Sequence, residues 1–362
     1  MQTNSNLQAV LDGQIGKGNI YNVVAAVQSD DRKIDFAGAA GIAEPQSGEA
    51  MTPNTPYFIA SVTKMYTAAI ILRLHEEKRV DLDAPISTYL PASLTRGIHV
   101  HKGTDYSERI KVYELVNQSS GIADYEADKS RIRRSVLDEL KAGRDLEIDT
   151  MEAIEITRSL SPHFAPGTRG KAYYSNTNYR LLGAIIESVT GKPMATNFQD
   201  MLFAPLGLEH TYLFDWRTPR SEDVPAAIYL KDRLANVPRY LSSNISDGGL
   251  VSTAIECVIF LRAFFEGRLF DKALFERMLN WNTLFFPLRY GYGLMYFRLP
   301  RFFSLHPPPE LIGHSGSTGS FAFTCPSQSM YLAGTVNQIA SPAKPFFLMS
   351  DLVRVAGRFE GK

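Results

Sequence analysis

Two residues near the start of the chain, Ser61 and Lys64, have the types and spacing that nucleophilic catalysis requires. They lead into the apolar stretch 65–74, which predicts a buried helix with both side chains on one face. A serine hydroxyl is a weak nucleophile at its ordinary pKa and needs an adjacent base. Burial and the positive end of the helix dipole both favour a neutral Lys64 amine, which could accept the serine proton. The pattern predicts covalent catalysis by Ser61, with its backbone N–H facing the oxyanion.

The Ser-x-x-Lys spacing is common, and the chain contains it a second time at Ser341 and Lys344. There Pro342 follows the serine, which is typical of an N-cap followed by proline at the first helical position. The spacing alone is therefore weak evidence for a catalytic pair. The case for Ser61 depends on residues elsewhere in the chain.

A second motif, Tyr174-x-Asn176, lies in a loop before an amphipathic helix. In that position a phenol and an amide could stand beside Ser61. The phenol can act as general acid or base if neighbouring positive charge lowers its pKa. The amide could orient Lys64 and the substrate. The alternative is that Tyr174 is a core aromatic residue and Asn176 a turn residue.

A third motif, His314-Ser315-Gly316-Ser317, follows a short apolar strand. Small residues at a strand edge let a substrate backbone lie alongside, and the N–H near Ser317 could be the second oxyanion donor. We expect these four residues to bind the substrate. With an ordinary pKa of about 6.5, His314 should be largely neutral at pH 7.5 and gain charge towards pH 6. The alternative is a hydrogen-bonded core histidine.

The composition is that of a globular chain with no basic face. Its 362 residues suffice for one large domain or two intertwined ones, and equal numbers of acidic and basic residues argue against a nucleic-acid partner. Cys257 and Cys325 have no metal or redox spacing, which favours free core thiols. The sequence has no secretory signal and no apolar run of about 18 residues, which predicts a cytoplasmic protein without a membrane span. No cofactor or metal is implied, and the oligomeric state stays open.

Predicted strands lie at both ends of the chain and predicted helices in its middle. The predicted order begins with a hairpin at 23–38 and ends with a helix at 344–358. Further strands are expected at 290–297, 311–313, 321–325 and 330–336. Helices are expected at 129–144 and 180–187. The order predicts an α+β fold in which both ends of the chain build one sheet. We expect a discontinuous sheet domain of residues 1–80 and 245–362, and a mainly helical domain of residues 81–244.

Taken in order, the motifs resemble the serine beta-lactamase-related family. The resemblance is to the branch that holds class C beta-lactamases, D-alanyl-D-alanine carboxypeptidases, D-amino acid peptidases and amidases, and related esterases. It runs from about Val23 to Asn337. It includes these further segments: Asp81-Leu82-Asp83, Ser119-Ser120-Gly121, Pro166-Gly167-Thr168, Thr190-Gly191-Lys192, Phe203-Ala204-Pro205-Leu206-Gly207-Leu208 and Gly248-Gly249-Leu250-Val251-Ser252-Thr253.

The resemblance implies an antiparallel sheet flanked by helices plus a helical domain, with the site between them. It implies a serine hydrolase that acts through an acyl-enzyme on ester, amide or beta-lactam bonds of a small-molecule substrate. Ser61 would be the nucleophile, Lys64 its base partner and Tyr174 the proton shuttle. Asn176 would orient the substrate.

His314 departs from the pattern, because beta-lactamases of this branch carry lysine there. Histidine is more typical of the peptidases and esterases, so a D-alanyl-D-alanine carboxypeptidase or a D-amino acid peptidase or amidase is the alternative. The carboxypeptidases hold the substrate carboxylate with a basic residue after a Gly-Tyr-Gly-Leu strand. Arg298 is out of register with that position, and we do not assign it this role. The aromatic-rich stretch from Trp281 to Phe303 is expected at the pocket rim.

Other hydrolase classes fit the sequence less well. The chain has no Gly-x-Ser-x-Gly, which argues against an α/β-hydrolase. His99-x-His101 is the only close histidine pair and has no evident third metal ligand. A further hypothesis is a non-catalytic penicillin-binding member of the family. Loss of Ser61, Lys64 or Tyr174 would have favoured it, and all three are present.

Overall fold

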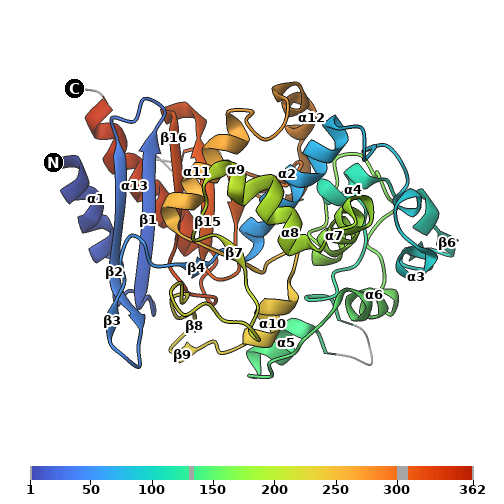
Figure 1. The fold of residues 1–362 in the computed structure, drawn as a ribbon, viewed down its shortest axis with the longest axis horizontal. Coiled ribbons are helices and arrows are strands. Elements are labelled where there is room, and N and C mark those ends of the chain that lie inside the picture. Colours follow the sequence, from blue (N-terminus) through green and yellow to red (C-terminus); the bar gives the residue numbers. More distant parts are fainter. Residues whose placement is uncertain (1, 130–133, 300–308, 361–362) are drawn as a thin grey trace.

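A nine-stranded antiparallel sheet, built from both ends of the chain, organises the molecule (Figure 1). The structure is a computed structural model that describes residues 2–129, 134–299 and 309–360. The sheet order is β11-β12-β13-β14-β15-β16-β1-β2-β3. These strands are β1 Asn22–Ser29, β2 Asp35–Glu44, β3 Glu49–Ala50, β11 Asn282–Phe285, β12 Leu288–Tyr290, β13 Met295–Phe297, β14 Leu311–Ser315, β15 Ser320–Cys325 and β16 Met330–Thr335. β1 pairs with β16, from Val24 opposite Thr335 to Ser29 opposite Met330, and so joins the two ends of the chain.

Both faces of the sheet are covered, which explains why residues 23–27 of β1 are all apolar instead of alternating with polar residues. Val23, Ala25 and Val27 pack in one core cluster with α1 Gln2–Asp12 and α13 Lys344–Glu360. Val24 and Ala26 point to the other face and join the main core. Two apolar helices, α2 Thr63–Glu76 and α11 Ala254–Phe265, belong to that core. Figure 1 shows α1 and α13 beside the sheet and the remaining helices on its other side.

Mostly short helices and short strands, joined by long loops, lie between α2 and α11. The helices are α3 Ala92–Thr95, α4 Val112–Val116, α5 Val136–Lys141, α6 Thr150–Arg158, α7 Asn176–Thr190, α8 Met194–Phe198, α9 Ala204–Leu206 and α10 Pro238–Ser243; α12 Phe275–Met278 follows later. The small sheets pair β10 Leu250–Ser252 with both β4 Tyr57–Phe58 and β7 Tyr212–Leu213, β5 Val100–His101 with β6 Thr104–Asp105, and β8 Tyr229–Leu230 with β9 Arg233–Leu234.

The predicted α+β class, with one sheet assembled from both termini, is confirmed. The strand expected over 290–297 is wrong: a turn at Gly293, with φ of 70°, separates β12 from β13. The helix expected over 129–144 is reduced to α5, capped by Ser135, and residues 130–133 lie outside the described residues. The division into two domains at residues 80 and 245 stays a prediction. Every helix in the described part of the chain is too short or too polar to cross a lipid bilayer.

The turn between β14 and β15 is tied to the segment that leads into Ser61. Thr318 Oγ1 donates to the Phe58 carbonyl at 2.9 Å, and Ser320 Oγ donates to the Ile59 carbonyl at 2.7 Å. Gly316 lies where these two segments meet. A Cβ atom at Gly316 would come within 2.6 Å of the Ile59 carbonyl oxygen and within 2.1 Å of Ser320 Oγ.

We predict that Gly316→Ala destabilises the protein by about 1–3 kcal/mol, because overpacking forces the two segments apart. Thermal unfolding followed by circular dichroism measures this. Gly248→Ala is the control, since its Cβ would meet neighbours at 3.5 Å or more, which is ordinary contact distance. Equal loss of stability in both variants would contradict the close contact at Gly316.

Candidate active site

Ser61 stands at the middle of a single 3-10 turn, Ala60–Val62, directly before α2. The preceding residue, Ala60, has a φ of 46°, which is in the left-handed region that alanine rarely adopts. Such backbone strain persists only where surrounding contacts over-determine it, and it is common at functional sites. The spacing of Ser61 and Lys64 predicts that Ser61 begins the α-helix. Ser61 instead lies in the 3-10 turn just before it.

The Lys64 amine is completely buried and surrounded by three oxygen atoms. Nζ lies 2.6 Å from the Asp247 carbonyl oxygen, 2.7 Å from Asn176 Oδ1 and 3.2 Å from Ser61 Oγ. The first two oxygens can only accept hydrogen bonds. A neutral amine directs its two hydrogens at those carbonyl oxygens, which leaves its lone pair facing the Ser61 hydroxyl.

Burial lowers the pKa of Lys64 to about 8, against the opposing pull of the carboxylates Asp247, Glu126 and Asp124. The neutral form, which can take the Ser61 proton, is therefore accessible near neutral pH. This agrees in direction with the sequence argument, although burial and not a helix dipole is the main cause.

The Tyr174 hydroxyl is hydrogen-bonded to Ser61, and its ring centroid is 5.1 Å from Lys64 Nζ. The sequence argument allowed a Tyr174 pKa lowered by positive charge, and this is wrong. Burial is the largest effect and raises the pKa of Tyr174 well above its usual value of 10. Tyr174 therefore stays protonated at neutral pH, in a form suited to passing a proton rather than to acting as a phenolate base.

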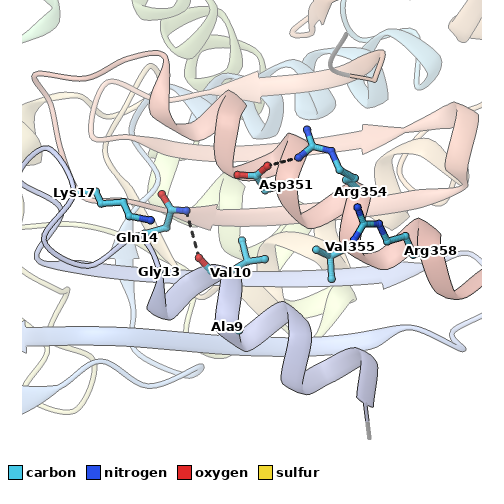
Figure 2. A pocket seen from close by; sticks show the side chains of 9 residues that line it. All are labelled: Ala9, Val10, Gly13, Gln14, Lys17, Asp351, Arg354, Val355 and Arg358. Atoms are coloured by element: carbon cyan, nitrogen blue, oxygen red, sulfur yellow. Dashed lines mark hydrogen bonds and ion pairs between the residues drawn. The ribbon is translucent and has the colours of Figure 1, made fainter. Parts of the chain in front are cut away.

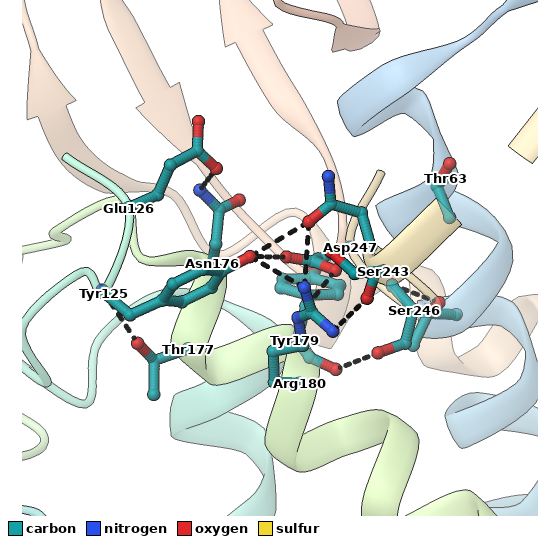
Figure 3. Close-up of polar contacts among 12 residues, drawn as sticks. Thr63, Tyr125, Glu126, Asn176, Thr177, Tyr179, Arg180, Ser243, Ser246 and Asp247 are labelled. Carbon is teal, nitrogen blue, oxygen red and sulfur yellow. Dashed lines mark hydrogen bonds and ion pairs between the residues drawn. The ribbon is translucent and has the colours of Figure 1, made fainter. Parts of the chain in front are cut away.

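Asn176 is the first residue of α7, and both ends of its amide are engaged. Its Oδ1 accepts from Lys64. Its Nδ2 donates to Glu126 Oε2 at 2.7 Å (Figure 3). Its backbone N–H donates to Asp124 Oδ1 at 3.0 Å. These contacts orient the amide and connect Lys64 to a pair of carboxylates that sequence analysis missed.

His314 is completely buried, and both of its ring nitrogens have partners within the protein. Nδ1 lies 2.7 Å from the Ser315 carbonyl oxygen, and Nε2 lies 3.0 Å from the Tyr290 hydroxyl. The carbonyl can only accept, so Nδ1 carries the proton and Nε2 accepts from Tyr290. Burial, with the Lys64 charge, lowers the His314 pKa to about 3. The expected gain of charge towards pH 6 is therefore wrong.

A cavity of about 170 Å³ opens beside Ser61. Its lining comprises Ala60, Ser61, Asp124, Glu126, Ala127, Tyr174, Asn176, Tyr240, Leu241, Asn244, Asp247, Gly248 and Ser317. Of the four third-motif residues, only Ser317 reaches this cavity; His314, Ser315 and Gly316 do not line it. None of the described residues between Trp281 and Leu299 lines it, and residues 300–303 lie outside the described part. Arg298 is exposed and pairs with Glu310 at 3.7 Å.

The cavity lining is acidic. Asp124 is buried, and burial together with the neighbouring Glu126 charge raises its pKa to about 8; burial also raises the pKa of Glu126. Among the described lining residues none is lysine, arginine or histidine. The available sequence signal was position: both acids closely follow Ser119-Ser120-Gly121.

A larger groove of about 290 Å³ lies elsewhere, between α1 and α13 (Figure 2). It contains none of the predicted site residues. Its lining includes the basic side chains Lys17, Arg354 and Arg358 and one acidic side chain, Asp351, which pairs with Arg354 at 2.8 Å. The chemistry-bearing residues thus gather at the smaller cavity.

The chain belongs to the beta-lactamase family, since the family profile described as Beta-lactamase matches residues 7–349. The teichoic acid D-alanine hydrolase of Staphylococcus aureus is 24% identical over 279 residues. That match covers 76% of this chain and 63% of the relative, so the chain spans less than two thirds of that protein's length.

Two solved structures have the same fold. The D-amino acid amidase of Ochrobactrum anthropi SV3, in complex with D-phenylalanine, superposes with a TM-score of 0.80 at 24% identity, covering 99% of this chain and 100% of that one. EstCE1, described as a hydrolase with promiscuous acyltransferase activity, superposes with a TM-score of 0.78 at 18% identity, covering 98% and 99% of the two chains.

We predict that Ser61→Ala abolishes covalent labelling by a fluorophosphonate, because no other serine has a buried amine facing its hydroxyl in the described structure. Intact-protein mass spectrometry measures the adduct. Ser341→Ala, at the second Ser-x-x-Lys, should label like the parent. An adduct that persists in Ser61→Ala would refute the assignment.

We predict that kcat/KM for an uncharged ester, p-nitrophenyl butyrate, rises with pH through a midpoint near 8. The sign follows from Lys64: the amine accepts a proton only after losing its own, and its pKa is about 8. A pH series from 5.5 to 9.5 measures the curve. A flat profile, or a midpoint near 6, would be inconsistent with Lys64 as the base; His314 cannot supply such a midpoint, because its pKa is about 3.

Proposed function

We propose that this protein is a serine hydrolase that forms an acyl-enzyme on Ser61. Its preferred substrates are amides or esters of D-amino acids that carry a free α-ammonium group. The observation that carries the proposal is the acidic cavity beside the Ser61–Lys64 pair. Glu126 and Asp124 line the same small cavity as Ser61, and no described basic side chain lines it.

The proposed first step is transfer of the Ser61 proton to the neutral Lys64 amine as Oγ attacks the substrate carbonyl. The lone pair of Lys64 faces this hydroxyl at 3.2 Å. The backbone N–H groups of Ser61 and Ser317 are the proposed oxyanion donors. Tyr174, protonated and bonded to Ser61, gives its proton to the leaving amine or alkoxide and regains one from Lys64. Water then cleaves the acyl ester through the same groups in reverse order.

The charge of the cavity supports the choice of substrate. A carboxylate-bearing substrate, such as a beta-lactam, would bring a negative charge next to Glu126 and Asp124 and would gain no attraction from them. An ammonium would instead stabilise their ionised forms, which burial and mutual repulsion disfavour in the free protein. His314, neutral and buried, offers no compensating positive charge.

The relatives support the stereochemistry of the proposal. One is named a teichoic acid D-alanine hydrolase, and another is a D-amino acid amidase whose structure contains D-phenylalanine. Both names describe D-amino acid derivatives. An amino acid amide or an O-linked D-alanyl ester carries a free ammonium beside the reacting carbonyl. A cavity in which acidic side chains lie beside the nucleophile suits such a substrate.

We predict that Glu126→Gln lowers kcat/KM for D-alanine p-nitroanilide by about 10- to 100-fold, because a charge-assisted hydrogen bond to the ammonium is lost. The same variant should hydrolyse p-nitrophenyl butyrate, which has no ammonium, at a rate close to that of the parent. Both rates are measured by release of the chromophore. The L-alanine anilide, tested in parallel, should be the poorer substrate for the parent.

The matched control is Glu108→Gln, which removes an exposed carboxylate that does not line the cavity. It should leave both rates unchanged. An equal loss on both substrates in Glu126→Gln would assign Glu126 to holding Asn176 rather than to recognising an ammonium.

A further inference from the structure

The Asp247 carbonyl, which holds the Lys64 amine, belongs to a residue whose side chain is buried against an arginine. Asp247 is 2% exposed, and Arg180, on α7, is 1% exposed. Arg180 Nε and Asp247 Oδ1 are 3.1 Å apart. Their geometry is that of an ion pair rather than of an aligned hydrogen bond, since neither atom has a hydrogen-bond partner. A buried charge pair of this kind needs further polar contacts to offset its desolvation.

Those contacts come from Tyr125 and Ser243 (Figure 3) and from Asn244. The Tyr125 hydroxyl lies 3.1 Å from Asp247 Oδ2 and accepts from Arg180 Nη2 at 2.9 Å. Arg180 Nη2 also donates to Asn244 Oδ1 at 2.9 Å, and its Nη1 donates to the Ser243 carbonyl. The guanidinium thus fastens the segment 243–247 to α7, the helix that also supplies Asn176.

The same segment is also fastened to α2. Thr67 Oγ1, on α2, donates to the Ser246 carbonyl at 2.7 Å, while Ser246 Oγ adds a second link to α7 by donating to the Tyr179 carbonyl at 2.9 Å. With Arg180 on α7 and Thr67 on α2, the carbonyl of Asp247 has a determined direction. That direction decides where the hydrogens of Lys64 point, and hence whether its lone pair faces Ser61.

We propose that Arg180 and Asp247 are positioning residues for Lys64: their buried ion pair aims the Asp247 carbonyl at the amine and keeps the two charges beside it balanced. The inference rests on the proposed base role of Lys64. It adds a requirement that the motifs of Ser61, Lys64 and Tyr174 do not contain, namely an ion pair of zero net charge next to the amine.

Several other groups face Lys64, and they set the background against which the pair acts. Asp124 and Glu126 lie on the cavity side, and their charges favour the ammonium form. The rings of Tyr174 and Tyr179 have centroids 5.1 and 5.5 Å from Nζ. His314 lies on the β14 side and is neutral. The Arg180–Asp247 pair differs from these groups, because it holds two opposite charges that can be removed one at a time.

The charges of the pair act on Lys64 in opposite directions: Asp247 raises its pKa and Arg180 lowers it. Asp247→Asn leaves the Arg180 charge uncompensated, so the ammonium is disfavoured and the amine loses its proton at lower pH. Arg180→Gln leaves the Asp247 charge uncompensated, so the amine loses its proton at higher pH. Each shift should be about one pH unit or more, because the effective dielectric inside a protein is far below that of water and a single uncompensated charge near the amine is then only partly screened.

The test is the pH profile of kcat/KM for p-nitrophenyl butyrate, with the rate of Ser61 labelling by a fluorophosphonate as a second readout. The midpoint should fall by about one unit or more in Asp247→Asn and rise by about one unit or more in Arg180→Gln. In the double variant Arg180→Gln/Asp247→Asn it should return to the parent value. A residue that only maintains the fold would change amplitudes or melting temperature without moving the midpoints in opposite directions.

Glu266→Gln is the matched control, since it removes the carboxylate paired at 2.8 Å with another arginine, Arg262, away from the cavity. Its midpoint should equal that of the parent. If one single variant fails to fold, the other and the charge-balanced double variant decide between the outcomes. If both single variants fail to fold, the double variant alone decides. A pH midpoint of the double variant that differs from that of the parent overturns the proposal, and an unchanged midpoint with slower Ser61 labelling supports it.

The outcomes also separate this inference from the proposed function. A parent protein that is never labelled at Ser61, at any pH, refutes the hydrolase assignment itself. A parent with a midpoint near 8 and single variants with the same midpoint refutes only the role of Arg180 and Asp247.

Discussion

The burial of one lysine amine is the constraint on which the arrangement of this site depends. An amine removed from water without partners would cost several kcal/mol, so the surrounding chain must supply hydrogen-bond partners. Here they come from three places far apart in sequence: Ser61 before α2, Asn176 at the start of α7, and the carbonyl of Asp247. Because these partners must converge on one atom, α2, α7 and the turn before β10 are fixed relative to one another.

The same burial sets the chemistry. Removing the amine from water lowers its pKa, and the nearby carboxylates limit how far it falls. The result is an amine whose neutral form becomes a large fraction at slightly alkaline pH. A fully exposed lysine would remain an ammonium and could not take the serine proton. Burial also disfavours the charged form of Tyr174, but for a phenol this raises the pKa, so the hydroxyl stays protonated.

The third-motif histidine shows how one residue changes the electrostatics of a cavity. His314 is held by Tyr290 and by the Ser315 carbonyl, and it carries no charge near neutral pH. A cavity with a lysine at this position would have a cation to offer an anionic substrate. Without it, the carboxylates of Asp124 and Glu126 dominate the described lining, which is why an ammonium is the better-matched group.

Much of this could be predicted from the amino-acid sequence, because periodicity and short motifs report local structure. The apolar stretch after Ser61 predicted a buried helix, the strands at both ends predicted a shared sheet, and the ordered motifs predicted the family. These features depend on residues close together in the chain or on their order along it, which a sequence records directly.

What only the tertiary structure decided is which groups meet and how deeply they are buried. No local pattern indicates that Asp247 lends its carbonyl to Lys64, or that Arg180 lies behind it, because these residues are 183 and 63 positions away from their partners Lys64 and Ser243. The pKa of Tyr174 and that of His314 were misjudged for the same reason. Desolvation is a property of the folded environment on all sides of a group, and neither residue type nor spacing contains it.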